Sequence, residues 1–174
     1  MIKPIVLYGK RILREQAKPF KIGENVKPII QDLWDTMYNA GGAGLAGPQI
    51  SIGQRIFVVD VPFKDFKGVF INPQIKEYFG KDLKLEEGCL SLPQLNADII
   101  RPAGIEIEWY DENWEHHVEK MEGMKSRVIQ HEYDHLEGTL WIDKVDPALG
   151  MHMLQPLRDI TYRTIDFSVG YPYI

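Results

Sequence analysis

The sequence predicts a single α+β domain in which mostly antiparallel sheets wrap around a central helix. Two segments, 24–40 and 123–137, carry apolar residues at helical spacing. Short segments with strand character lie before and between them, without strict alternation of strands and helices. No internal repeat or Gly/Ser-rich linker interrupts the 174 residues. We therefore expect one domain that spans residues 1–174.

The first helical segment, 24–40, has one apolar face. Apolar residues recur there every three or four positions, as in a helix that packs one side against a core. They are Val26, Ile29, Ile30, Leu33, Trp34, Met37 and Tyr38. The pair Gly41-Gly42 follows, and we expect it to end the helix.

Strands are expected at four places. Residues 55–61 (RIFVVDV) are rich in β-branched side chains, and residues 69–72 form a shorter apolar run before a proline. Residues 104–110 alternate apolar and polar side chains, which is the pattern of a strand with one solvated face. A turn then leads into a fourth strand at 115–121.

The second helical segment, 123–137, should be buried. Met124, Val128, His131 and His135 fall on one side of it. The tail, 145–174, is less clear. Residues 147–159 are compatible with a short helix, and residues 160–174 with a strand or an extended arm.

Composition and charge exclude several classes of protein. No apolar run approaches the roughly 20 residues of a membrane-spanning helix. The first residues lack the apolar core of a signal peptide, so we expect a cytoplasmic protein. A net charge of −5 disfavours broad nucleic-acid binding, and no specific nucleic-acid site is evident. The single cysteine, Cys89, has no partner for an internal disulfide, and its thiol is free for packing, nucleophilic chemistry or metal binding.

Residues 131–135 form an H-E-x-x-H motif on the second predicted helix. Side chains at positions i and i+4 lie on the same helix face, so His131 and His135 are able to bind one cation. Glu132 lies about 100° around the helix from His131. It is therefore placed at the edge of such a site, where a general base is needed.

A catalytic metal usually takes a third protein ligand. The metzincin pattern would place a histidine at position 141, and this chain has Trp141 there. A thermolysin-like site would need a later glutamate, and none follows Glu137. Later aspartates remain, without a recognisable context. We favour Cys89, because a thiolate is a strong ligand for divalent transition metals.

Three stretches together resemble the signatures of the bacterial peptide deformylases. Residues 42–49 (GAGLAGPQ) are similar to the first signature, G-x-G-L-A-A-P-Q. Residues 87–91 (EGCLS) match the second, and residues 130–135 (QHEYDH) match the third, Q-H-E-x-D-H. The resemblance implies a metal-dependent hydrolase that removes the formyl group from the N-terminal formyl-methionine of nascent polypeptides and releases formate.

The resemblance also implies roles for individual residues. One divalent metal would bind Cys89, His131 and His135, with Fe²⁺ favoured in the cell and Zn²⁺, Ni²⁺ or Co²⁺ as substitutes in preparations. The catalytic groups would be Glu132 as base and then acid, and two oxyanion donors, the side-chain amide of Gln49 and the backbone N–H of Leu90. The substrate-binding residues would be Gly44, Gly88 and Val128. An ion pair between Glu87 and Arg101 is expected to hold the cysteine segment.

Expected partners are formyl-methionyl nascent peptides, with transient ribosome contact. Two departures from the family pattern stand out. Gly47 replaces a usual alanine, and we expect looser packing or extra backbone freedom there, worth at most about 1 kcal/mol, without loss of chemistry. The tail after about Lys144 lacks the long basic final helix common in the best-known form of the family.

Two alternatives from other classes remain open. One is an H-E-x-x-H metalloprotease, which the missing third histidine or glutamate disfavours. The other is an inert relative that binds formylated peptides or nascent chains. A degenerate binder would be expected to lack at least one of the chemistry-bearing residues, and all are present. His116 and His117 are interpreted as surface residues.

Overall fold

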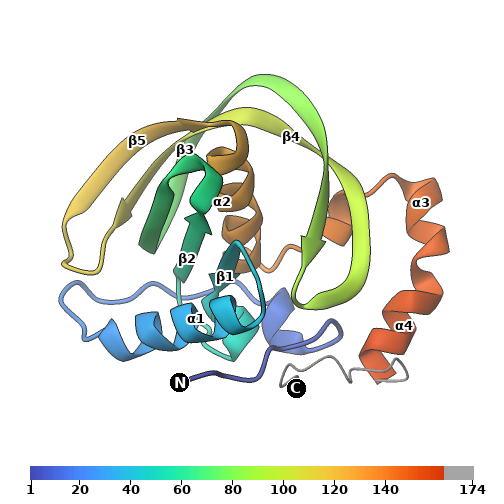
Figure 1. Ribbon diagram of the computed structural model, residues 1–174, viewed down its shortest axis with the longest axis horizontal. Helices are drawn as coiled ribbons and strands as arrows, with labels where there is room; N and C mark the ends of the chain where they lie inside the picture. The colour runs from blue at the N-terminus through green and yellow to red at the C-terminus, as the bar shows by residue number, and fades with distance from the viewer. Residues whose placement is uncertain (163–174) are drawn as a thin grey trace.

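The structure is a computed structural model, and it describes residues 1–162 (Figure 1). The described part contains five strands, four α-helices and four short 3₁₀ helices. The strands are β1 (Gly44–Ala46), β2 (Ile56–Val61), β3 (Phe66–Cys89), β4 (Leu92–Tyr110) and β5 (His116–Glu122). The α-helices are α1 (Lys27–Asn39), α2 (Gly123–Leu136), α3 (Pro147–His152) and α4 (Leu154–Tyr162). The 3₁₀ helices are Arg11–Arg14, Gly47–Ile50, Pro62–Lys64 and Trp141–Lys144.

All five strands form one antiparallel sheet in the order β1-β2-β3-β4-β5. β3 and β4 make a long hairpin, and their register shifts at four places. Such irregularities bend a strand and increase its twist. The hairpin accordingly curves over α2 in Figure 1, and the helix contacts β1, β2, β4 and β5. The expected α+β fold, with an antiparallel sheet around a central helix, is confirmed.

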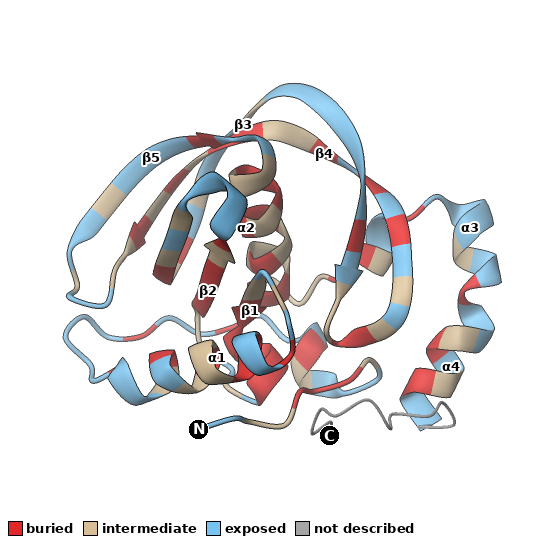
Figure 2. Ribbon diagram, viewed as in Figure 1, coloured by how far each residue is buried: buried red, intermediate tan, exposed pale blue. Residues whose placement is uncertain are grey.

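Helix α2 is unusual because much of its buried face is polar. Its buried polar residues are Ser126, Arg127, Gln130, Glu132 and His135. Buried polar groups are costly unless hydrogen bonds or ion pairs compensate for lost hydration. Figure 2 shows buried residues on several turns of this helix beneath the sheet. We therefore expect the functional site to lie along this buried polar face of α2.

Apolar packing holds the helices and the sheet in place. Phe57, Phe70 and Trp109 pack in a row in the cluster that also includes Ile129 of α2. A second cluster joins the buried face of α1 to the sheet, and a third joins β4 to the C-terminal helices. Trp141, the residue that replaces a metzincin ligand, is fully buried in the third cluster.

The predicted elements are present, but the strands are longer than expected. The stretches predicted at 69–72 and 104–110 are parts of β3 and β4, so the strand residues 66–68, 73–89 and 92–103 were missed. Most side chains from residue 76 to residue 86 are exposed, and little apolar alternation marks them as a strand.

In the tail, the predicted short helix is present as α3 and α4. Residues 160–162 are helical, so the expected strand or arm is wrong at its start, and residues 163–174 lie outside the described residues. Ile160 explains the continuation, because it is buried on the apolar face of α4. No helix within residues 1–162 is long and apolar enough to span a membrane.

Candidate active site

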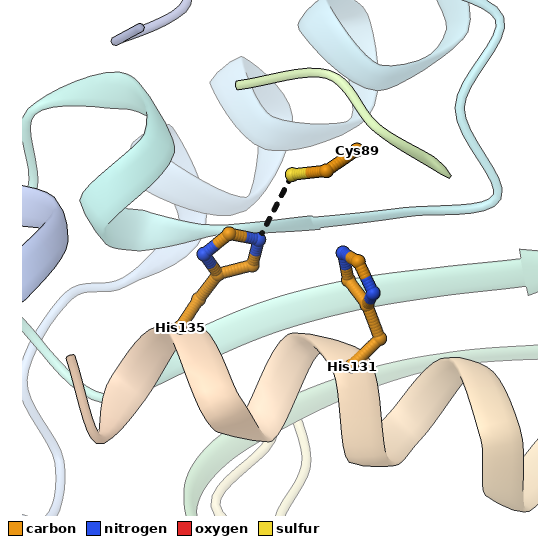
Figure 3. A group of neighbouring side chains, drawn as sticks. All are labelled: Cys89, His131 and His135. Atoms are coloured by element: carbon orange, nitrogen blue, oxygen red, sulfur yellow. Dashed lines mark hydrogen bonds between the residues drawn. The ribbon is translucent and has the colours of Figure 1, made fainter. Parts of the chain in front are cut away.

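The end of β3 and the middle of α2 bring three potential metal ligands together. The side chains of His131 and His135 point to the same side of α2, towards Cys89 (Figure 3). Sγ of Cys89 lies 3.3 Å from Nε2 of His135. One ligand atom from each residue lies within 4.8 Å of the other two. The predicted cysteine and both predicted histidines therefore form one compact group.

The donor set fits a divalent transition metal. One thiol and two imidazoles suit zinc and neighbouring transition metals by ligand type. Burial lowers the pKa of His135 well below its ordinary value, which favours the neutral ring that a metal requires. Nδ1 of the same ring has no hydrogen-bond partner among residues 1–162.

A buried carboxylate, Glu87, lies behind His131. One of its oxygens lies 2.9 Å from Nδ1 of His131. Burial alone would raise the pKa of Glu87, but hydrogen bonds from His131 and Arg101 outweigh it and hold the pKa well below its ordinary value. Burial likewise opposes protonation of His131, yet contacts with Cys89 and Glu87 raise its pKa. Cys89 and Glu87 thus favour the protonated, positively charged form of His131, at the position where a metal cation would bind.

Arg101 of β4 forms the expected ion pair with Glu87. Its Nε and Nη2 donate to the two carboxylate oxygens at 2.7 and 2.9 Å. Nη1 also donates to Asp134 of α2 at 2.7 Å. Arg101 is 3% exposed, so its two hydrogen bonds to Glu87 are shielded from water. The prediction of a Glu87–Arg101 pair is confirmed, and the link to Asp134 is additional.

Glu132 is buried beside the group of three ligands. It is 4% exposed, and its Oε2 has no hydrogen-bond partner in the described part of the chain. Burial raises the pKa of Glu132 to about 7. Gly44 makes room for it, because a side-chain carbon at that position would overlap the carboxyl group. This glycine is thus required by the contact between β1 and α2.

Gln49 is fixed in one orientation by local hydrogen bonds. Its Oε1 accepts from the N–H of Ala46 at 2.9 Å. The amide nitrogen consequently faces the cysteine segment, where it donates to Ser91 Oγ at 3.2 Å and lies 3.5 Å from Sγ of Cys89. Leu90 follows Cys89 directly, and its side chain lies against Gly42.

Gly47 does not loosen the structure, and that expectation is wrong. A side-chain carbon there would lie 2.8 Å from the carbonyl oxygen of Ile52 and 2.9 Å from that of Gln54. The backbone after the 3₁₀ helix folds back closely onto this residue. The absent methyl group allows the close approach, and the site is tightly packed.

A cleft of about 600 Å³ opens onto these groups. All of the predicted site residues except His135 line it, including Gly44, Gly88 and Val128. Its wall also includes residues that the sequence did not lead us to assign to the site: Met124, Arg127, Leu92, Pro93, Gln94, Leu95 and Asn96. Met124 lies four residues before Val128 and Arg127 four residues before His131, and this helical spacing could have identified both.

His116 and His117 lie outside this site, as predicted. The His117 side chain is 33% exposed, its Nε2 lies 3.0 Å from Asp111, and its ring stacks on Trp109. His116 is exposed at the same hairpin.

Comparison with known proteins agrees with this geometry. The profile of the polypeptide deformylase family matches residues 2–149. Peptide deformylase from Cytophaga hutchinsonii is 45% identical over 175 residues, which covers 97% of this chain and 95% of that one. Peptide deformylase from Christiangramia forsetii is 45% identical over 161 residues, or 83% and 82% of the two chains.

Solved structures give the same result. The crystal structure of peptide deformylase from Thermus thermophilus has a TM-score of 0.85 at 37% identity, with 93% of this chain and 96% of that chain covered. Peptide deformylase from Thermotoga maritima has a TM-score of 0.80 at 40% identity, with 84% and 99% covered. The sequence signatures, the fold and the group formed by Cys89, His131 and His135 thus agree, and this chain belongs to the polypeptide deformylase family.

Proposed function

We propose that this chain is a hydrolase that removes the formyl group from the N-terminal formyl-methionine of nascent polypeptides and releases formate. The observation that carries the proposal is the convergence of Cys89, His131 and His135 beside a cleft that the first two residues line, in a member of the deformylase family. Glu132 and Gln49 line the same cleft. A reacting amide would therefore meet a base and hydrogen-bond donors at one place.

Cys89, His131 and His135 would hold one divalent metal. When bound, the metal would lower the pKa of water and polarise a carbonyl group. The resemblance to the family leads us to favour Fe²⁺ in the cell. A thiolate and two imidazoles suit zinc by ligand type and also accept Ni²⁺ or Co²⁺, so these ions would be able to replace it. A thiolate ligand also makes the site sensitive to oxidation.

Glu132 would act as base and then as acid. A carboxylate with a pKa near 7 is able to accept a proton from the attacking water and return it to the departing amine. Its burial and its unpaired Oε2 support this role. Because Oε2 of Glu132 has no partner within residues 1–162, it is available to bind water or substrate.

Gln49 and the N–H of Leu90 would stabilise the oxyanion that forms as the formyl carbon becomes tetrahedral. Such donors are effective when they are oriented before the charge develops. The hydrogen bond from Ala46 to Oε1 of Gln49 supplies this orientation for the side-chain amide.

Gly44, Gly88 and Val128 would bind the substrate along the cleft. The side of Gly44 is occupied by the Glu132 carboxyl group and that of Gly88 by the Asn96 side chain, so the two glycines would offer the peptide their backbone groups. Val128 would offer an apolar surface to the methionine side chain. Selectivity for a formyl group follows if the space beside the carbonyl carbon accepts hydrogen and excludes a methyl group.

The proposed partners are formyl-methionyl nascent peptides, met during transient contact with the ribosome. This substrate places the activity in the cytoplasm, where translation begins. An alternative function as a metalloprotease has the same H-E-x-x-H motif in its favour, and an inert peptide binder would share the cleft.

The test is formate release from formyl-Met-Ala-Ser by protein purified without oxygen, with iron, zinc and nickel measured on the same sample. We expect rapid release, about one metal per chain, and loss of activity in Glu132→Ala. An unformylated peptide is the matched substrate control. Metal-loaded protein that leaves the formyl peptide intact would overturn the proposal, and cleavage of the control peptide would indicate a protease.

A further inference from the structure

Arg127 is a buried arginine of α2 for which the proposed reaction gives no role. Its side chain is 6% exposed. Nη1 lies 2.8 Å from a carboxylate oxygen of Glu87 and 2.9 Å from the carbonyl oxygen of Ile99, and Nη2 donates to the carbonyl oxygen of Leu83. A buried guanidinium is costly unless such partners compensate for lost hydration. The contacts of Arg127 therefore form a specific connection between α2 and the β3–β4 hairpin.

The connection continues the geometry of the proposed metal ligands. Arg127, His131 and His135 are spaced by four residues, so their side chains share one face of α2. Glu87 and Cys89 lie two residues apart near the end of β3. The two rows face each other, with Arg127 against Glu87, His131 against Glu87, and His135 against Cys89. Arg127 makes the first contact in this series.

The charges of the buried network also depend on Arg127. Arg101 and Arg127 supply two positive charges, and Glu87 and Asp134 supply two negative charges; Lys144, which is 36% exposed, also lies 3.4 Å from Asp134. Without Arg127, Glu87 would lose one of its two arginine partners. The carbonyl groups of Leu83 and Ile99 would also each lose a donor. The Glu87 oxygen that both arginines contact would then be held by Arg101 alone, and the carboxylate that contacts His131 would be less firmly fixed.

We propose that Arg127 is a positioning residue for the metal site. It ties the helix that carries His131 and His135 to the strand that carries Glu87 and Cys89, and so fixes the thiol relative to the imidazoles. The inference rests on the proposed function only in taking Cys89, His131 and His135 as ligands. Arg127 lies in the wall of the cleft, but its guanidinium group contacts Glu87 and two backbone carbonyl groups, so we assign its effect on the ligands to Glu87.

The test measures Co²⁺ affinity by competition with a chelator and records the absorption band of the cobalt–thiolate bond. Arg127→Met removes the charge and donors but keeps an apolar side chain. Arg127→Lys keeps the positive charge but lacks the planar guanidinium group, which donates to several acceptors at once. The control is Arg55→Met, because Arg55 is also largely buried and also bridges two elements, through Glu137 at 2.7 Å and the carbonyl oxygen of Pro73 at 3.0 Å.

We expect Arg127→Met to bind Co²⁺ about 10–100-fold more weakly than wild type and to change the thiolate band, as losses behind metal ligands typically do. Arg127→Lys should show a smaller loss. Arg55→Met should unfold at lower urea concentration but keep wild-type cobalt affinity. This combination would separate positioning of the ligands from general stability.

Wild-type affinity in Arg127→Met, or an equal loss in Arg55→Met, would overturn the role of Arg127. If Arg127→Met does not fold, the Co²⁺ affinity of Arg127→Lys tests the proposal instead. Wild-type Co²⁺ affinity in that variant would overturn the proposal. The wild-type protein tests the proposed function separately. Cobalt-loaded wild type that releases no formate would overturn the function alone, while absence of a thiolate band in wild type would overturn both.

Discussion

Nδ1 of His131 lies 2.9 Å from a carboxylate oxygen of Glu87. This contact orients the imidazole so that its other nitrogen, Nε2, is left for a metal. Glu87 is in turn held by two arginines from different elements, Arg101 of β4 and Arg127 of α2. A local feature of one helix, the H-E-x-x-H motif, is thereby connected to the β3–β4 hairpin.

Arg101→Ala should lower activity without abolishing metal binding. The variant removes the fork on Glu87 and the contact with Asp134, so the carboxylate that orients His131 loses its main anchor on β4. We also expect unfolding to become easier by about 3–5 kcal/mol, because a buried carboxylate loses a partner. Formate release, metal content and urea unfolding measure the three effects.

Arg14→Ala is the matched control for Arg101→Ala. Arg14 also makes a two-pronged contact with a carboxylate, Asp143, but both side chains are 39% exposed. Its loss should cost at most about 1 kcal/mol. Equal effects of the two variants would contradict the role given to burial.

Gln49→Ala should reduce turnover by about 10²–10³, which is the usual effect of removing one oxyanion donor. Gln49→Met separates this effect from stability, because it keeps an unbranched side chain of similar length without donor groups and without a buried charge. Both variants should be slow, with Gln49→Met unfolding closer to wild type. Normal turnover in either variant would remove Gln49 from the mechanism.

Gly47→Ala should destabilise the protein by about 1–3 kcal/mol, as overpacking of a tight site usually does. The added methyl group would lie against the carbonyl oxygens of Ile52 and Gln54. Gly53→Ala provides a nearby control, since nothing lies within 4 Å of a side-chain carbon there. Thermal or urea unfolding of both variants would check the prediction, and a stable Gly47→Ala would restore the expectation of loose packing.

Asp111→Asn should make stability less dependent on pH in the acid range. Burial alone would raise the pKa of Asp111, but His117 and the backbone N–H groups of Asn113 and Glu115 outweigh it and lower the pKa. The unfolded-state pKa of an aspartate is about 4. Because the folded-state pKa of Asp111 is lower, its carboxylate stabilises the folded protein fully at pH values above the unfolded-state pKa, and this contribution disappears as the pH falls through the folded-state pKa.

The free energy of unfolding of the wild type should accordingly exceed that of Asp111→Asn by about 0.5–1 kcal/mol at neutral pH, and the difference should shrink below about pH 4. Urea unfolding at a series of pH values measures this. A difference that stays constant, or grows as pH falls, would show that the charge of Asp111 is not responsible.

The candidate ligands were predictable from the sequence because their chemistry depends on local spacing. Two histidines four residues apart share one face of a helix wherever that helix lies in the fold, as His131 and His135 do. The thiol of Cys89, the single cysteine, is the obvious candidate for a third ligand. The two helices follow from apolar periodicity in the same way, and the strand at 55–61 follows from its β-branched side chains. The long β3–β4 hairpin was underestimated because its middle is mostly exposed and carries little apolar alternation.

The sequence by itself therefore determined the fold class, the family resemblance and the residue types available for chemistry. The tertiary structure alone decided that Arg127 meets Glu87 across 40 residues of sequence, and that the backbone closes over Gly47. The physical reason is that periodicity specifies which face a side chain occupies on its own element. Its partner across the core depends on strand register, the bend of the hairpin and the packing of α2 beneath it, and no local pattern encodes these.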